Sequence, residues 1–250
     1  MITNISLAPF ELLKVRAQLL MEGRKLHGWG TERGSPMVRN YEAVIESGAG
    51  LRGLFTGYDT LLARSLWYGT FRCFFYCNLF NYVNKDPRRT PHWWIDSLTS
   101  FSAGFIAGVL TNPIDIVYNR QVADALYPDS VKRNYSSFLD GLFKANAERA
   151  LFRGAVASGC AYGALLGSMS SFYDFAKEYC YWLFGPTEWL RPMILIPTTA
   201  LGVMLYLPFD NIKVRYHTMT ALPNGEMPYK SFLDSILKVI IFNIGFILRR

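Results

Sequence analysis

Acidic and basic side chains recur together at three places in this 250-residue chain, each time shortly after a proline. In the stretch PFDNIKVR, Pro208–Arg215, Asp210 and Lys213 stand three residues apart, so both charges lie on one face of a helix. The apolar run Met193–Leu207 directly precedes this stretch. Opposite charges that follow such a long apolar segment indicate the floor of a polar cavity rather than a face exposed to lipid.

The same pattern occurs twice more, as PFELLKVR from Pro9 to Arg16 and as PIDIVYNR from Pro113 to Arg120. The copies start about a hundred residues apart, and a motif that recurs at such a period indicates an internal threefold repeat. Proline cannot donate a backbone hydrogen bond, so each copy is expected to kink or end the helix before it. We therefore predict three repeats, over residues 1–90, 91–186 and 187–250.

The composition favours a membrane protein. Hydrophobic residues make up 51% of the chain and aromatic residues 16%, whereas charged residues make up 18%, which is low for a soluble domain. The formal net charge is +7, but the basic residues cluster where apolar runs stop and do not form a stripe. This distribution is expected beside anionic lipid headgroups, so membrane lipids are the predicted partners and nucleic acid is not.

The sequence holds no constellation typical of an enzyme. The four cysteines form no CxxC pair, and Cys73 and Cys77 share a helix face without a nearby histidine. They are interpreted as small apolar side chains rather than metal ligands. The three histidines are scattered along the chain. We therefore predict no catalytic residue, no metal site and no enzymatic cofactor.

The apolar runs predict four long helices, because a membrane-spanning helix needs about 20 residues. Their expected bounds are Tyr58–Val83, Trp93–Asn112, Ala155–Phe172 and about Leu190–Leu207. The third is expected to end at Tyr173–Lys177, and the fourth to be interrupted by Pro192 and Pro197. Gly104 and Gly108 have the GxxxG spacing that lets two helices approach closely. Short amphipathic helices are predicted near Tyr41–Gly50, over Ser136–Arg149 and from Tyr229.

Two arginines, Arg64 and Arg72, lie inside the first of these apolar helices, close to one face. An arginine within the membrane is usually functional, so the pair could bind an anionic substrate. The alternative is that they contact another chain, water or lipid headgroups.

Together the three motifs resemble the signature of the mitochondrial carrier family, in which P-x-[DE]-x-x-[KR]-x-[KR] and a glycine–aromatic–basic–glycine element occur three times. The resemblance covers essentially the whole chain. The segments GLRGLFTG, with Arg64 and Arg72 downstream, and NPIDIVYNR are similar to the 2-oxoglutarate and dicarboxylate carriers. The resemblance implies an all-α membrane protein, a bundle of three pseudo-repeats that crosses the mitochondrial inner membrane several times.

The resemblance also implies a gate on the matrix side, in which the acid of one motif pairs with a base of another. The gate residues would be Pro9, Glu11, Lys14, Gln18, Pro113, Asp115, Pro208, Asp210 and Lys213. The implied ion pairs are Asp115 with Lys213 and Asp210 with Lys14, whereas Glu11 would face Tyr118, which cannot form an ion pair. These charges could form a moving gate or a static lock.

Two further sites follow from the resemblance. Tyr173, Asp174 and Lys177 match the family's gate on the opposite side of the membrane. The stretch Phe152-Arg153-Gly154 stands at a helix start, where backbone amides could hold a phosphate of cardiolipin. The alternative interpretation of this stretch is a simple anchor at the membrane interface.

The chain departs from the family pattern in two respects. Its first helix is expected to be a stub and its sixth to be missing, so the bundle would be incomplete at both ends, unless further helices lie beyond this chain. Arg64 matches one substrate-binding arginine of the family, but Ala161, beside Tyr162, takes the equivalent place in the fourth helix. Two substrate carboxylates in a low-dielectric cavity need paired cations.

The sequence therefore favours a transport-inactive structural subunit of a larger inner-membrane complex, such as a respiratory-chain assembly. Its partners would be other subunits of that complex and lipids that include cardiolipin. The alternative is an active carrier that exchanges 2-oxoglutarate or dicarboxylates by alternating access.

Overall fold

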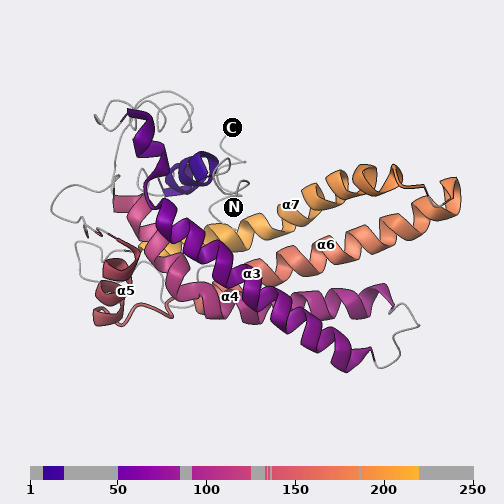
Figure 1. Cartoon of the computed structure of the whole chain (residues 1–250), viewed down its shortest axis with the longest axis horizontal. Helices are drawn as coiled ribbons and strands as arrows, with labels where there is room; N and C mark the ends of the chain where they lie inside the picture. The colour runs from indigo at the N-terminus through magenta and orange to yellow at the C-terminus, as the bar shows by residue number, and fades with distance from the viewer. Residues whose placement is uncertain are drawn as a thin grey trace, which may run out of the picture. The chain divides into compact units, whose positions relative to one another are not determined.

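The computed structural model of the chain describes residues 8–19, 50–84, 92–124, 133, 135, 137–185 and 187–219. Helices and turns account for nearly all of these residues and no strand occurs among them, which confirms the predicted all-α class. A helix over residues 8–19 precedes the short 3-10 helix η2 (Gly50–Phe55). Then follow α3 (Tyr58–Val83), α4 (Trp93–Asp124), α5 (Phe138–Ala147), α6 (Ala155–Phe184) and α7 (Leu190–Thr218) (Figure 1).

Several predictions concern residues outside this described part. They are the amphipathic helix near residues 41–49, the helix from Tyr229, and the state of the chain at its two ends.

Two of the described helices are both long and apolar enough to cross a membrane, α4 with a mean hydropathy of 1.3 and α7 with 1.6. Helices α3 and α6 contain 26 and 30 residues, which exceeds the roughly 20 residues that a span requires. Within its most apolar window, α4 is 61% buried and α7 only 17%. Helix α7 therefore exposes apolar side chains over most of its circumference.

Three helices extend further than the sequence predicted. Helix α4 does not end at Asn112 but continues through Pro113 to Asp124. Helix α6 does not end at Tyr173–Lys177 but continues to Phe184 and stops at Gly185, whose φ of 73° is accessible chiefly to glycine. Helix α7 runs without a break through Pro192, Pro197 and the Pro208 motif. Pro192 falls in the first turn, where no hydrogen bond is lost, and interior prolines are tolerated in membrane helices.

The chain folds as two compact units. The first contains Met1–Trp67, Asn112–Arg153 and Val214–Arg250, and the second contains Tyr68–Thr111 and Gly154–Lys213. Each unit thus takes residues from all three predicted repeats, because the long helices α3, α4 and α7 contribute to both.

The first unit has an apolar core formed by several segments that are distant in sequence. Leu12 and Val15 of the helix over residues 8–19 pack with Leu61 of α3, Val122 of α4 and Val214 of α7, and all five are buried. Leu12 and Val15 have the i, i+3 spacing of an amphipathic helix that faces a core. The helix that carries the first charged motif is therefore fixed by apolar packing.

In the second unit, α4 and α6 touch along glycines and serines. A Cβ atom on Gly104 would lie 2.7 Å from the backbone oxygen of Tyr162, and one on Gly108 would lie 2.9 Å from that of Ser158. Two serine pairs bond across the same contact, Ser170 to Ser100 at 2.7 Å and Ser171 to Ser97 at 2.5 Å. The GxxxG spacing of α4 therefore does mark a close helix–helix contact.

Substitution of Gly104 with alanine should destabilise the protein, because the new methyl group meets backbone rather than a movable side chain. Overpacking of this kind costs about 1–3 kcal/mol, which lowers Tm by about 2–4 °C per kcal/mol in a chain of this size. Thermal unfolding in detergent measures the change. Gly69→Ala is the matched control, since nothing lies within 4 Å of its Cβ position, and it should keep or raise Tm. Equal losses for both variants would contradict the close contact.

Candidate functional site

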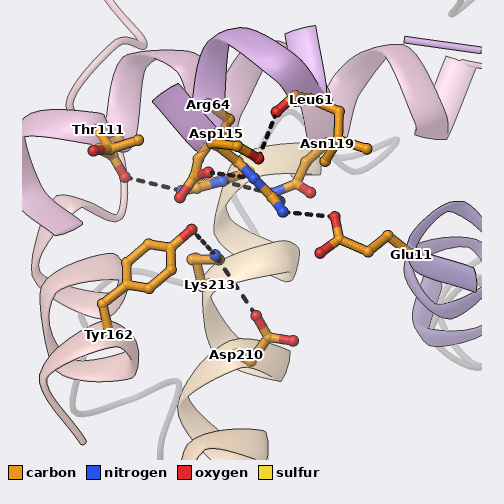
Figure 2. Close-up of polar contacts among 12 residues, drawn as sticks. Glu11, Leu61, Arg64, Thr111, Asp115, Asn119, Tyr162, Asp210 and Lys213 are labelled. Carbon is orange, nitrogen blue, oxygen red and sulfur yellow. Dashed lines mark hydrogen bonds and ion pairs between the residues drawn. The ribbon is translucent and has the colours of Figure 1, made fainter. Parts of the chain in front are cut away.

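Arg64 of α3 lies between two carboxylates (Figure 2). Its Nη2 atom is 2.6 Å from Oε2 of Glu11, and its Nε atom is 3.8 Å from Oδ1 of Asp115. The guanidinium also stands 5.0 Å from the centroid of the Tyr118 ring, a cation–π geometry. The side chain of Asp115 is completely buried and that of Arg64 is 17% exposed. The positive charge of Arg64 is thus engaged by groups of the protein itself.

This arrangement differs from the one expected for the first motif. The family resemblance implied that Glu11 would face Tyr118, which cannot form an ion pair; the cation that Glu11 pairs with is Arg64. Tyr118 is buried and offers its ring to the same guanidinium. Arg64, which the family resemblance assigns to substrate binding, therefore supplies the cation that Tyr118 cannot supply.

The third motif, on α7, pairs within its own turn. Lys213 Nζ lies 3.6 Å from Oδ1 of Asp210, and both side chains are buried (Figure 2). Tyr206 donates a hydrogen bond to the same carboxylate. Lys213 also donates to the hydroxyl of Tyr162 at 3.4 Å and stands 4.4 Å from the centroid of its ring. The ion pairs expected between motifs, Asp115 with Lys213 and Asp210 with Lys14, join residues of different units and stay predictions.

The last residue of the second motif, Arg120, is the largest fully buried side chain of the described structure. Its Nη1 atom donates to Glu148 Oε2 at 2.7 Å and to the Tyr135 hydroxyl at 3.0 Å. Its Nε atom donates to the backbone oxygen of His217 at 3.1 Å. Glu148 is thus the carboxylate that neutralises Arg120, and the pair fastens the turn after α5 to α4.

His217 of α7 is held between two asparagines of α4. Its Nδ1 atom lies 2.8 Å from the Asn119 amide nitrogen, and its Nε2 atom lies 3.0 Å from the Asn112 amide oxygen. Because an amide nitrogen only donates and an amide oxygen only accepts, this geometry assigns the imidazole proton to Nε2. The Asn112 amide in turn donates to the Leu151 oxygen at 2.7 Å. The first unit therefore contains a buried, interlinked polar network.

At the other predicted gate, Asp174 and Lys177 of α6 line a cavity of ≈ 590 Å³, and Tyr173 is not among its lining residues. Asp96 of α4 lines the same cavity. Lys177 Nζ stands 5.8 Å from the centroid of the Tyr181 ring. The sequence indicated Asp174 and Lys177 of α6 but not Asp96, which belongs to none of the motifs.

The lipid-binding stretch Phe152-Arg153-Gly154 forms the turn that leads into α6. Gly154 is the N-cap of α6 with a φ of 74°, in the left-handed region that favours glycine. Phe152 is exposed. Burial, followed by the positive charge of Arg120, lowers the pKa of Arg153. A cation beside a helix start suits an anionic group, so this stretch stays a predicted cardiolipin site.

The remaining predicted residues are not gathered into one site. Lys14 and Gln18 lie on the helix over residues 8–19, and Pro113 and Pro208 lie inside α4 and α7. Pro9 is in the first turn of the helix over residues 8–19. Arg72 is exposed on α3 and belongs to the second unit, whereas Arg64 belongs to the first. Ala161 is completely buried in α6.

Among the described residues, no group of three or more His, Cys, Asp or Glu side chains could hold a metal ion. Cys73 and Cys77 are exposed, so they do not fill the core of the described structure.

Comparison with known proteins shows which family part of the chain resembles. Residues 89–182 match the model of the family described as mitochondrial carrier protein. This match overlaps the predicted second repeat, and the boundaries of the three repeats stay predictions.

The curated relatives extend the similarity over most of the chain. It is 40% identical to the macronuclear solute carrier homologue CR-MSC of Oxytricha fallax over 96% of this chain and 65% of that protein. It is 27% identical to a putative mitochondrial 2-oxoglutarate/malate carrier of Neurospora crassa over 96% of this chain and 72% of that protein. It is 26% identical to the mitochondrial 2-oxoglutarate/malate carrier of Bos taurus over 95% of this chain and 75% of that protein.

The chain spans about 65% of the length of the Oxytricha relatives that it matches. The charged motifs, the helical structure and these similarities agree with one another. The chain is a homologue of the mitochondrial carriers, related to proteins named 2-oxoglutarate/malate carriers.

Proposed function

We propose that this protein is a carrier-derived, transport-inactive component of the mitochondrial inner membrane that serves as a structural subunit of a larger membrane complex. The observation that carries the proposal is the state of Arg64, whose guanidinium neutralises Glu11 and the buried Asp115. A cation that already balances two carboxylates is poorly suited to attract the carboxylate of a substrate. Arg64 then acts as a static lock between α3 and the first two charged motifs.

The position equivalent to a second substrate cation supports the same proposal. Ala161 is completely buried, and the adjacent Tyr162 stacks on Tyr68 with ring centroids 4.3 Å apart. The ammonium group that stands over the Tyr162 ring belongs to Lys213, which already pairs with Asp210. Because an uncompensated buried charge costs several kcal/mol, a dicarboxylate would be poorly stabilised beside these groups.

The surface of α7 supports a role in a membrane assembly. Its most apolar window is only 17% buried, and Met193, Ile196 and Met204 are each more than half exposed. Such a surface suits lipid or the transmembrane helices of neighbouring subunits. Cardiolipin at Phe152-Arg153-Gly154 is the lipid that we propose for the turn before α6.

The proposal predicts that the chain migrates with a large complex when mitochondria are solubilised in mild detergent and separated on a native gel. An epitope-tagged copy should appear in one high-mass band, together with subunits of that complex, such as a respiratory-chain assembly. Dissociation of the complex with a harsher detergent should release the tagged chain. A folded monomer in the mild detergent would show that the chain is not a structural subunit.

A second candidate function is exchange of 2-oxoglutarate or dicarboxylates by alternating access. The names of the relatives in Neurospora crassa and Bos taurus favour it. The two functions differ in what Arg64 does, since a lock contributes stability and a substrate ligand contributes transport.

A further inference from the structure

The second unit contains a cavity of ≈ 590 Å³ with aromatic walls. Tyr76 and Phe80 of α3, Trp93 of α4 and Tyr181 of α6 line it. The rings of Tyr76 and Phe80 stack with centroids 5.6 Å apart. The volume is within the range of small-molecule sites, about 300–1,000 Å³, and aromatic side chains are their usual lining.

The charged groups of this cavity are mostly acidic. Asp96, Asp174 and Glu178 line it together with a single described lysine, Lys177. His92 also lines it, beside the Trp93 ring at 5.8 Å between centroids. With a neutral histidine and ionised acids, the lining has more negative than positive charge, so an anionic ligand is disfavoured there.

Two of these acids, Asp96 and Asp174, line the same cavity. Asp96 also accepts a hydrogen bond from the Tyr76 hydroxyl at 2.7 Å. Carboxylates that share a site repel each other unless a positive charge lies near them. Lys177 provides one ammonium group, which stands over the Tyr181 ring at 5.8 Å. The cavity therefore already holds one ammonium group in cation–π geometry. Its three acidic side chains outnumber that single ammonium group, so a second cation can pair with them.

We propose that this cavity binds a small organic cation in which an ammonium group is attached to an apolar or aromatic body. The ammonium would lie between Asp96 and Asp174, and the body would lie against Trp93 and Phe80. This site does not include Arg64, and its proposed ligand is a cation, unlike the 2-oxoglutarate and malate in the names of the relatives. The proposal therefore does not depend on the proposed function.

The full chain, purified in detergent, should bind phenethylammonium in isothermal titration calorimetry. Its uncharged analogue 2-phenylethanol and its anionic analogue 3-phenylpropionate have the same aromatic body and should bind at least about tenfold more weakly, because they lack the cation that the carboxylates attract. Equal affinity for the amine and the alcohol would reduce the site to an apolar pocket and overturn the proposal.

Three variants locate the binding. Asp96→Asn keeps a hydrogen-bond acceptor for Tyr76 but removes the charge, and should weaken phenethylammonium binding about tenfold. Lys177→Met removes the competing ammonium and should strengthen binding, a gain that misfolding cannot produce. Asp59→Asn, an exposed acid of α3 in the other unit, should leave the affinity unchanged. Unaltered affinity in both Asp96→Asn and Lys177→Met would refute the site.

A protein ligand is the other outcome to distinguish. A lysine-rich peptide that binds the chain while phenethylammonium does not would assign the acidic cavity to a partner protein and overturn the small-molecule proposal.

Discussion

Replacement of Glu148 with alanine is expected to lower the free energy of unfolding by about 3 kcal/mol, because it removes the carboxylate that neutralises the buried Arg120. Among the described residues, the other hydrogen-bond partners of Arg120 are the Tyr135 hydroxyl and the His217 backbone oxygen, which are both neutral. Removal of one member of a buried ion pair costs about 3–5 kcal/mol, and the half-exposed position of Glu148 places the expectation at the lower end. Chemical denaturation in detergent micelles measures the loss.

The control removes an ion pair on the surface. Glu188→Ala breaks the contact with Arg191, 3.3 Å away, in which the two side chains are 83% and 59% exposed. Exposed ion pairs add little to stability, so this variant should unfold at the same denaturant concentration as the parent protein. A loss as large as that of Glu148→Ala would mean that burial of Arg120 is not the cause.

Replacement of Arg64 with alanine should likewise destabilise the protein by about 3 kcal/mol, since it leaves the completely buried Asp115 without the guanidinium beside it. Arg72→Ala is the matched control on the same helix, because Arg72 is exposed and its loss should change stability little. Denaturation curves of the two variants give the comparison. A stable Arg64→Ala protein would show that Arg64 is not a lock.

Transport separates the same two interpretations of Arg64. In liposomes, the parent protein is expected to show no saturable exchange of internal malate for external 2-oxoglutarate. Exchange that Arg64→Ala abolishes without loss of stability would establish the carrier alternative.

The double variant Arg64→Leu with Asp115→Asn should recover part of the stability that Arg64→Ala loses, because the buried Asp115 carboxylate is then removed together with its cation.

The sequence predicted the ends of a long helix well where a glycine or a polar segment bounds it. Helix α3 begins and ends at the predicted residues, since Gly57 precedes it and a polar segment follows Val83. The predicted end of α6 was wrong because charged residues such as Asp174 and Lys177 were interpreted as a helix end. They lie inside the helix and line a cavity. The prolines in α7 were interpreted as helix breaks, but the helix continues through them. Membrane helices tolerate interior prolines.

The site was harder to predict, since spacing within a motif shows only which side chains share a helix face. The pairing of Asp210 with Lys213 lies within that reach. The partner of Glu11 is Arg64, which comes from another helix, and no pattern in either segment indicates the contact. Glu148 and Asp96 stand outside all motifs, so only the packing of distant segments reveals their roles.

The contact between α4 and α6 has a consequence for motion. Its members are largely glycines and serines, such as Gly104, Gly108, Ser100 and Ser170. Glycine has no rotamers to lose, so the two helices join at little cost in side-chain conformational entropy. Between these small residues, the rings of Phe101 and Phe105 of α4 pack against Gly163 and Gly159 of α6. Sliding of one helix along the other would drive the rings into backbone, so α4 and α6 are expected to move as one rigid body.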